Sequence, residues 1–319
     1  MKILLITPEF FGYEKVIKKA LVKLGHEVDW LPHINAPNNW YKMLYRYVGF
    51  IMKKHFYYYV LSKFNGKSNY DKVVIIKGEG VGYKLLIKLK ELFPGVKLFF
   101  YNWDSFKNNG LSSEEFELYD KVKSFDSDDC KKNNNIEHLA LFYSNEYKLV
   151  KAADTGFLFY FAGTLHSNRY RDVMNVVSSV GDSSKSYIYF YCQSRFIFYL
   201  KKLFGILPRE LSISEVGFEK KTKSELRSLL LRSSCVIDFS HDHQVGLTMR
   251  TIEALGMKKK IVTNNVSVAD YDFFNENNIY ILGKNNCSLA DFLLLPYIDI
   301  PDDIYKRYDI DNWVNRLID

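Results

Sequence analysis

The stretch Gln244-Val-Gly-Leu-Thr-Met-Arg-Thr-Ile-Glu-Ala-Leu-Gly256, followed by Met-Lys-Lys-Lys-Ile-Val-Thr-Asn-Asn265, is the most informative part of the chain. It indicates a loop, a short helix that ends at a glycine, and then a buried strand. Because a glycine before a helix leaves backbone N–H groups at the positive end of the helix dipole, this arrangement suits a phosphate group. The N–H groups concerned belong to Gly246, Leu247 and Thr248.

This segment resembles the nucleotide-sugar site of glycosyltransferases with two Rossmann-like domains, the GT-B fold. The resemblance implies that Arg250 adds positive charge for a diphosphate and that Glu253 accepts hydrogen bonds from ribose hydroxyls. Many retaining members carry two glutamates separated by seven residues. Glu253 matches the second, but Val245 occupies the position of the first, so retention and inversion both stay open. The segment looks most like transferases of bacterial capsule and lipopolysaccharide synthesis.

Neighbouring residues supply further candidates and an alternative. His243 and Gln244 lie just before the helix and are expected to hydrogen-bond the donor. The pair His241 and His243 has no evident third ligand, so we expect no metal in the site. In the alternative interpretation this is an ordinary helix on which Arg250 and Glu253, three residues apart, pair with each other on a solvated face.

Composition limits the class of protein. The 319 residues are 25% charged and 47% hydrophobic, which is typical of soluble globular proteins and is enough for two domains. A formal charge of +7 fits an anionic substrate or membrane surface. The chain has no nucleic-acid-binding motif, so we expect no nucleic-acid partner. Its four widely spaced cysteines indicate reduced thiols in a cytoplasmic protein.

Strands and helices alternate along both halves of the chain, which favours parallel sheets covered by helices. Strands are expected in the first half at 2–7, 27–31, 70–77, 96–103, 121–125 and 138–142. Strands are expected in the second half at 156–163, 186–191, 211–216, 235–239 and 260–263. We expect domains at 1–150 and 151–301, with the C-terminal helix 302–319 completing the first.

A second small-residue loop, Ala162-Gly-Thr-Leu-His-Ser-Asn-Arg-Tyr-Arg171, follows the first strand of the second half. Ligands of open α/β sheets bind beyond the carboxyl ends of the strands. Gly163, Thr164, Arg169 and Arg171 are therefore candidates for contacts with a donor diphosphate, and Arg169 is favoured among them. The alternative is a helix start capped by Ser167, with surface arginines.

Carboxylates in the first half are candidates for the base that deprotonates an acceptor hydroxyl. Glu9 follows the first strand, before Phe10 and Phe11, and Asp104 follows the strand 96–103. Glu79, in a glycine-rich loop, is a further candidate. In the alternative, the carboxylates cap helices and the two phenylalanines belong to the core instead of stacking on a sugar.

The segment 40–64 mixes aromatic, aliphatic and basic residues and contains no acidic residue. Such a composition suits the surface of an anionic bilayer, where a lipid-linked acceptor would lie. The alternative is a helix packed on the first sheet, with its lysines solvated.

Together these features predict an α/β protein with two facing Rossmann-like domains, as in the GT-B fold. The resemblance implies a metal-independent hexosyltransferase without a cofactor. It would move a sugar from a nucleotide-sugar, UDP-sugar by default, to a growing surface glycan or lipid-linked acceptor. The first domain would bind the acceptor and the second the donor, in the cytoplasm or on the inner face of the membrane. The alternatives are a nucleotide-sugar epimerase of the same fold and a non-catalytic scaffold of a polysaccharide assembly complex.

Overall fold

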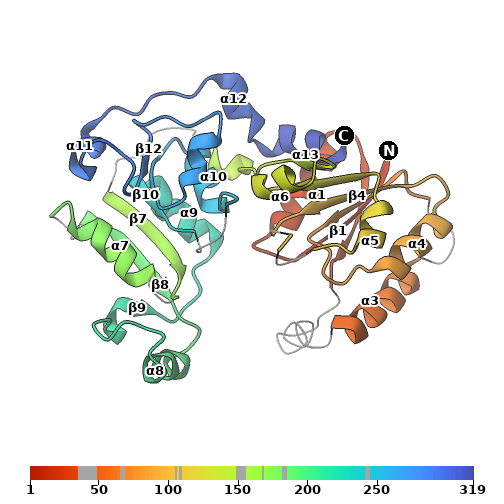
Figure 1. The fold of residues 1–319 in the computed structure, drawn as a ribbon, viewed down its shortest axis with the longest axis horizontal. Coiled ribbons are helices and arrows are strands. Elements are labelled where there is room, and N and C mark those ends of the chain that lie inside the picture. Colours follow the sequence, from red (N-terminus) through yellow and green to blue (C-terminus); the bar gives the residue numbers. More distant parts are fainter. Residues whose placement is uncertain are drawn as a thin grey trace. The chain divides into compact units, whose positions relative to one another are not determined.

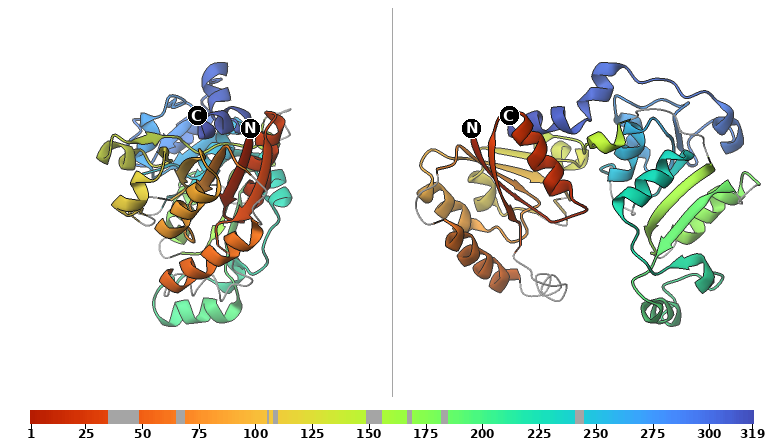
Figure 2. Two further views of the ribbon diagram at one scale, coloured as in Figure 1. Left: turned by 90° about the vertical axis from the view of Figure 1, so that its right-hand side faces the viewer. Right: turned by 180° about the vertical axis from the view of Figure 1, so that it is seen from behind.

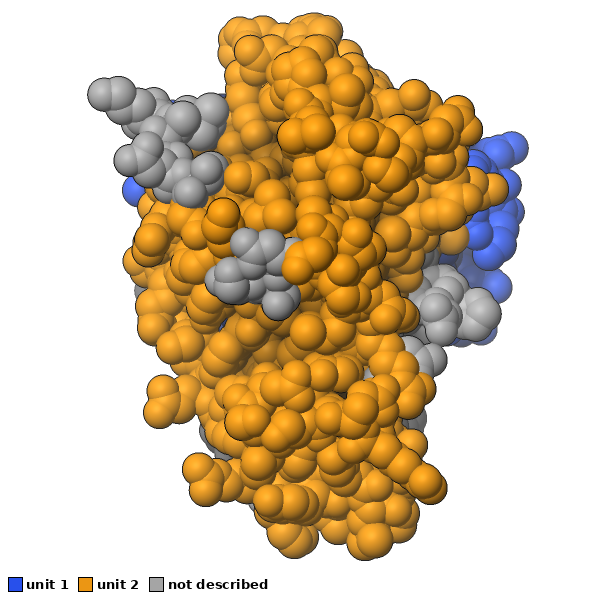
Figure 3. Space-filling model, turned by 90° about the vertical axis from the view of Figure 1, so that its left-hand side faces the viewer, with its two compact units in different colours: residues 1–141, 310–319 blue, residues 142–309 orange. Residues whose placement is uncertain are grey.

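The chain divides into two compact units, each built on a sheet of six parallel strands. The computed structural model describes residues 1–34, 49–64, 69–104, 106–107, 110–148, 156–166, 169–181, 185–240 and 245–319. Unit 1 comprises Met1–Leu141 and Ile310–Asp319, and unit 2 comprises Phe142–Asp309 (Figure 3). Helices flank both sheets (Figures 1 and 2), so the predicted α/β class with helix-covered parallel sheets is confirmed.

The sheet of unit 1 has the strand order β2-β1-β3-β4-β5-β6. Its strands are β1 (Lys2–Thr7), β2 (Glu27–Pro32), β3 (Lys72–Ile76), β4 (Lys97–Asn102), β5 (Lys121–Ser124) and β6 (Ile136–His138). Its helices are α1 (Tyr13–Lys23), α3 (Gly49–Lys63), α4 (Tyr83–Leu92), α5 (Ser113–Glu117), α6 (Ser127–Lys132) and α13 (Ile310–Ile318). The apolar run of β1 is completely buried, as a central parallel strand requires.

Helices α3 and α13 of unit 1 test two predictions, one for the segment 40–64 and one for the C-terminal helix. Phe56 and Val60 of α3 are fully buried in the core, so the described part of segment 40–64 packs on the sheet. Trp313 of α13 is buried, and its Nε1 donates to the Ala140 carbonyl at 2.8 Å. The chain thus returns to unit 1 with α13, whereas α12 (Asp302–Arg307) belongs to unit 2. Among the helices that the structure describes, none has the length and hydropathy of a bilayer-spanning segment.

The sheet of unit 2 has the order β12-β11-β10-β7-β8-β9. Its strands are β7 (Phe157–Thr164), β8 (Tyr187–Tyr191), β9 (Val216–Gly217), β10 (Ser233–Asp238), β11 (Lys260–Thr263) and β12 (Ile279–Ile281). Its other helices are α7 (Arg169–Ser178), α8 (Arg195–Leu203), α9 (Lys223–Leu231), α10 (Met249–Gly256) and α11 (Leu289–Leu294). Short 3₁₀ helices lie at η1 (Asn145–Tyr147), η3 (Ile213–Glu215) and η4 (Val266–Asp270).

Some local predictions are wrong. The strand expected at 138–142 lies earlier, at β6, and residues 139–142 continue as buried chain outside the sheet. Most of the segment 211–216 is not a strand. A capping box between Ser212 and Glu215 holds it as η3, and only its last residue enters β9. The short helices α5, α6 and α11 and the strand β12 were not predicted, because so few turns or residues give little periodicity.

Helix α10 ends at Gly256, as the sequence predicted, but this glycine does not adopt a left-handed conformation. The residue with positive φ is Lys258, at 51°. Gly256 is needed because a Cβ atom there would lie 2.6 Å from Cγ of Tyr143 and 2.8 Å from the Tyr147 carbonyl oxygen. The glycine therefore permits a close approach between α10 and the segment that opens unit 2.

Replacing Gly256 tests this close approach. We expect Gly256→Ala to lower the free energy of unfolding by about 1–3 kcal/mol, because the added methyl group overpacks a backbone contact. Urea denaturation of the whole chain measures the change. Ser224→Ala on the exposed face of α9 is the control, with an expected change within about 0.5 kcal/mol. Equal stability of the two variants would contradict the close-packing argument.

Candidate functional site

The order of strands in unit 2 reverses direction between β7 and β10. From β7 the chain proceeds to β8 and β9 on one side, and from β10 it proceeds to β11 and β12 on the other. Loops that leave these two strands diverge, and open α/β sheets bind ligands at the crevice that results. Both small-residue motifs of the second half follow one of these two strands, so the topology brings them to the same edge of the sheet.

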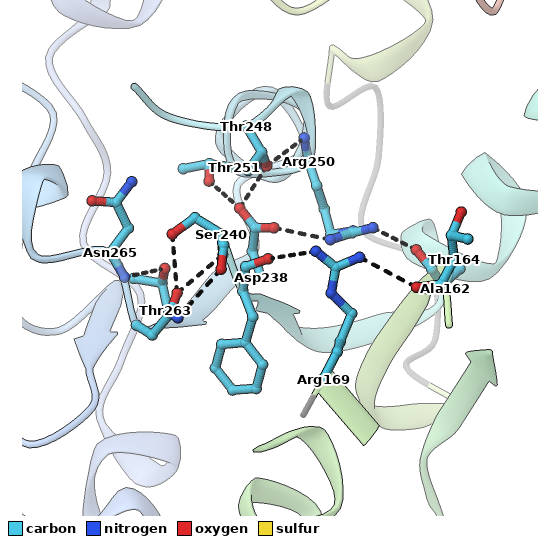
Figure 4. A network of polar contacts seen from close by, with 12 residues as sticks. Ala162, Thr164, Arg169, Asp238, Ser240, Thr248, Arg250, Thr251, Thr263 and Asn265 are labelled. Carbon is cyan, nitrogen blue, oxygen red and sulfur yellow. Dashed lines mark hydrogen bonds and ion pairs between the residues drawn. The ribbon is translucent and has the colours of Figure 1, made fainter. Parts of the chain in front are cut away.

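Asp238, the last residue of β10, is the centre of a polar network at this edge (Figure 4). Its side chain is buried, with 2% exposure. One carboxylate oxygen accepts hydrogen bonds from the hydroxyls of Thr248, at 2.6 Å, and Thr251. The other accepts from Arg250 Nη1 at 2.9 Å. Three residues of the loop and first turn of α10 are thereby tied to the strand that precedes them.

Arg250 also joins the two strands of the switch point. Its Nη2 donates to the carbonyl of Ala162, near the end of β7, while its Nη1 binds Asp238 (Figure 4). The guanidinium lies over the Phe161 ring, 5.1 Å from its centroid. A Cβ atom at Gly163 would lie 3.3 Å from Arg250 Nη2, so a small residue leaves room for this bridge. Arg250 and Gly163, predicted from separate motifs, are thus neighbours.

Arg169 brings a second guanidinium to the same place. Nη1 donates to the Thr164 carbonyl and Nη2 to the Phe239 carbonyl, each at 3.3 Å (Figure 4). Burial and the nearby positive charge of Arg250 lower the pKa of Arg169, although Asp238 acts in the opposite direction. The network therefore holds two guanidiniums around one carboxylate. This excess positive charge, at an edge where ligands bind, suits an anion.

The start of α10 is capped by its own sequence. The Thr248 hydroxyl accepts from the backbone N–H groups of Arg250, at 3.1 Å, and Thr251, at 3.3 Å. These two N–H groups are consequently not free for a phosphate. The predicted N–H donors of Gly246 and Leu247 belong to the preceding loop, where both residues are buried.

Glu253 lies one turn further along α10, partly buried. Burial raises the pKa of Tyr147, and the Glu253 carboxylate, which hydrogen-bonds the Tyr147 side chain, raises it further. Glu253 is therefore held by the segment that opens unit 2, and its contact with ribose stays a prediction. His243 and Gln244 lie outside the described residues, as does Ser167. Within the described ranges, no group of three or more His, Cys, Asp and Glu residues could hold a metal ion.

The lysine run after α10 has a structural role that the sequence did not reveal. Lys259 Nζ donates to the carbonyl of Leu231, at the end of α9, at 2.7 Å. Lys260 Nζ donates to three carbonyls around the end of α11. Lys258 pairs with Asp299 at 2.6 Å. Burial lowers the pKa of both Lys259 and Lys260. The ammonium groups of Lys259 and Lys260 therefore satisfy carbonyls near helix C-termini.

The candidate bases Glu9, Glu79 and Asp104 all lie in unit 1. They follow β1, β3 and β4, three neighbouring strands, so they lie at one edge of that sheet. Lys77 Nζ lies 2.8 Å from Glu79 Oε1 and 3.9 Å from Asp104 Oδ2. Sequence reasoning had not identified this lysine, which places a positive charge between the two carboxylates. The switch point of this sheet lies between β1 and β3.

The two aromatic residues after Glu9 are exposed to solvent. Phe10 is 50% exposed and Phe11 60%, and their rings form a T-shaped pair with centroids 4.6 Å apart. The alternative that they are core residues is therefore wrong, and their stacking on a sugar stays a prediction. The buried Glu14, which the sequence did not single out, accepts from the Phe10 backbone N–H at 3.2 Å and holds the loop.

Next to the Asp238 network, unit 2 has an open cavity of about 540 Å³, within the usual range of small-molecule sites. Phe239, whose carbonyl binds Arg169, lines one side, and Asn264 lines another. The remaining walls come from α7, from β12 and the residue after it, and from the start of α11. They combine apolar side chains with polar ones, namely Asp172, Asn175, Val176, Ser179, Tyr280, Leu282, Ser288, Leu289 and Ala290. The switch point therefore borders a concave surface of mixed polarity.

Comparisons with known proteins show the fold. No protein-family model matches the chain, and no curated protein matches its sequence. HepE of Anabaena, in a structure with UDP-glucose, is similar with a TM-score of 0.57 at 11% identity, over 100% of this chain and 98% of that one. Sucrose-phosphate synthase from Thermosynechococcus elongatus has a TM-score of 0.57 at 11% identity, over 100% and 94%.

A UDP-N-acetylglucosamine 2-epimerase is also similar, with a TM-score of 0.52 at 10% identity over 100% of this chain and 94% of that one. At such low identity the likeness concerns the fold alone. The chain has the GT-B fold of two Rossmann-like domains that the sequence predicted.

Removing the charge of Asp238 tests the network. We expect Asp238→Asn to lower the free energy of unfolding by about 3 kcal/mol, because it leaves the partly buried Arg250 guanidinium without its carboxylate. Urea denaturation measures the loss. The matched control is Glu210→Gln. Glu210 pairs with Arg171 at 2.5 Å, but both side chains are about half exposed, so the loss should stay below about 1 kcal/mol. Similar losses in both variants would refute the central role of Asp238.

Proposed function

We propose that the chain is a glycosyltransferase that moves a sugar from a nucleotide-sugar, UDP-sugar by default, to an acceptor hydroxyl. The observation that carries the proposal is the excess positive charge at the switch point of unit 2. Arg250 pairs with the Asp238 carboxylate there, whereas Arg169 donates to backbone carbonyls, and both lie beside loops built from small residues. A nucleoside diphosphate group has the charge and the oxygen acceptors that such a site lacks.

The fold supports this choice of donor. One protein of similar fold, HepE, has been crystallised with UDP-glucose. Fold alone does not define a reaction, so the proposal depends on the cluster of charges as well. We further propose a growing bacterial surface glycan or lipid-linked sugar as the acceptor, following the resemblance of residues 244–265 to capsule and lipopolysaccharide transferases.

The proposed reaction assigns each group a role. The acceptor oxygen forms a bond with the anomeric carbon, and the bond from this carbon to the phosphate oxygen breaks. The leaving diphosphate takes the electron pair, and Arg169 with the loop N–H groups stabilises its charge without a metal. In an inverting reaction, a carboxylate takes the proton of the acceptor hydroxyl. Glu9 and Asp104 are the proposed bases, and unit 1 is the proposed acceptor-binding unit.

A nucleotide-sugar epimerase is the second candidate, favoured by the likeness to a 2-epimerase over the whole chain. An epimerase would convert the nucleotide-sugar without an acceptor. A transferase would release free UDP at a rate that rises with acceptor. A non-catalytic scaffold would bind no nucleotide. A thermal-shift screen with UDP, GDP, CMP and dTDP, followed by assays of UDP release, separates the three.

Arg169→Gln tests the donor site. We expect the Kd for UDP to rise about 10- to 100-fold, since a charge-assisted hydrogen bond contributes about 1.5–3 kcal/mol. Isothermal titration calorimetry measures the affinity. Arg171→Gln is the matched control, because Arg171 lies in the first turn of the same helix but is half exposed and pairs with Glu210. If both variants bind UDP like the unmodified protein, the diphosphate does not lie at this switch point.

Glu9→Gln and Asp104→Asn test the base. We expect one of them to lower kcat for UDP release from UDP-glucose about 10²- to 10⁴-fold while leaving the affinity for UDP unchanged. The assay supplies lipid extracts and a panel of free sugars as acceptors. Glu91→Gln, on the solvent side of α4 and paired with Lys88, is the control. Full activity in both test variants would exclude these carboxylates as the base.

A further inference from the structure

Helix α8 and the turn after it present large apolar side chains to solvent. Leu203 is 79% exposed, Phe204 72%, Phe196 71%, Tyr199 58% and Ile206 49%. These five residues are here named the α8 surface. Single exposed apolar residues are ordinary, but five within eleven consecutive positions (196–206) form a patch that requires an explanation.

Contacts with the core and a hydrogen-bonded turn hold the α8 surface in a defined conformation. Phe196, Tyr199 and Leu203 are spaced by three and four residues and so share one face of the helix. On another face, Phe198 is only 1% exposed and belongs to the core of unit 2. Gly205, with a φ of 66°, ends the helix, and the Ile206 N–H donates to the Lys201 carbonyl at 2.8 Å. This turn holds Ile206 back against the last turn of the helix.

The charged residues of the segment that carries the α8 surface are all positive. Residues 195–209 include Arg195, Lys201, Lys202 and Arg209 but no acidic residue. Lys202 Nζ donates to the Arg209 carbonyl at 3.0 Å, which keeps this part of the chain close to the helix. The acid that follows, Glu210, pairs with Arg171. An apolar face with a basic border has the composition of helices that lie in the interface of anionic membranes.

Unit 2 has a second group of exposed apolar residues, and this group lacks the basic neighbours of the α8 surface. Leu294 is 84% exposed and Ile298 42%, but Asp291 and Asp299 lie near them in the sequence. This second group lacks the basic excess of residues 195–209, so anionic lipids would favour α8 over it. In unit 1, Phe56 and Val60 of α3 are buried, and among the side chains of this helix from residue 53 onward Tyr58, at 59%, is the large apolar residue that is exposed.

We propose that the α8 surface docks on an anionic lipid bilayer, with its apolar side chains in the interface and its basic residues against lipid phosphates. Charge favours this occupant over a second copy of the chain. A two-fold dimer brings the same patch of each copy together, so Arg195 and Arg209 would face like charges.

Direct contacts connect α8 to the candidate site of unit 2. In the fold, α8 lies at the end of unit 2 that carries the edge strand β9 (Figures 1 and 2). Lys201 Nζ donates to the Leu165 carbonyl at 3.2 Å, and Leu165 directly follows β7 and precedes Arg169. The proposal does not depend on the nature of the reaction catalysed.

The experiment is co-sedimentation of the full chain with vesicles of phosphatidylcholine alone or mixed with phosphatidylglycerol. We expect binding to the anionic vesicles to be at least about tenfold stronger than to the neutral ones and to weaken as NaCl is raised. Equal binding to both kinds of vesicle, or none to either, would overturn the proposal.

Variants assign the binding to α8. The double variant Phe196→Ser/Leu203→Ser should bind anionic vesicles at least about tenfold more weakly. Leu294→Ser, which removes an equally exposed leucine with acidic neighbours, should bind like the unmodified protein. Because removing apolar groups could perturb folding, Arg195→Gln/Arg209→Gln gives an independent test and should also weaken binding. Undiminished binding by both double variants would overturn the proposal. So would self-association of the unmodified chain that the serine variant abolishes while vesicle binding persists.

Discussion

The buried carboxylate of Asp238 is the interaction on which the candidate site of unit 2 depends. It lies at the end of β10 and receives the hydroxyls of Thr248 and Thr251 and the guanidinium of Arg250. A buried charge is costly unless it is paired and hydrogen-bonded, so these donors must occupy fixed positions around it. Arg250, which Asp238 holds through Nη1, also donates from Nη2 to the Ala162 carbonyl near the end of β7. The same carboxylate is thereby linked to the ends of both β10 and β7.

Much of the conspicuous charge near the site stabilises the fold. Lys259 and Lys260 donate to carbonyls at the ends of α9 and α11, where helices have no intrahelical partner for those groups. Thr248 satisfies the start of α10. Once these groups are assigned to the fold, Arg169 stands out as the cation whose partners at the switch point are backbone carbonyls. The structure therefore narrows the candidate cations for an anion to fewer residues than the sequence did.

Long elements could be predicted because their signals are local. The strand expected at 2–7 is β1, and the one expected at 260–263 is β11, since buried parallel strands are continuous apolar runs. The helix end expected at Gly256 is confirmed, although the sequence did not reveal that a side chain at this position would collide with Tyr143. Predictions failed where a tertiary contact overrides the local signal. The apolar residues 139–142 are buried without joining a sheet. Asp238 was overlooked, although an acidic residue ending a buried strand was a usable signal.

The sequence by itself determined the α/β class, the parallel sheets and the two loops that carry the site candidates, because hydrophobic periodicity and glycine positions are properties of short segments. Only the tertiary structure decided which of those residues meet. Arg250 and Gly163 are far apart in the sequence, and they become neighbours because β7 and β10 pair at the point where the strand order reverses. The roles of the lysines were decided in the same way. A charge has no function until the fold determines which groups surround it, and those groups come from distant parts of the chain.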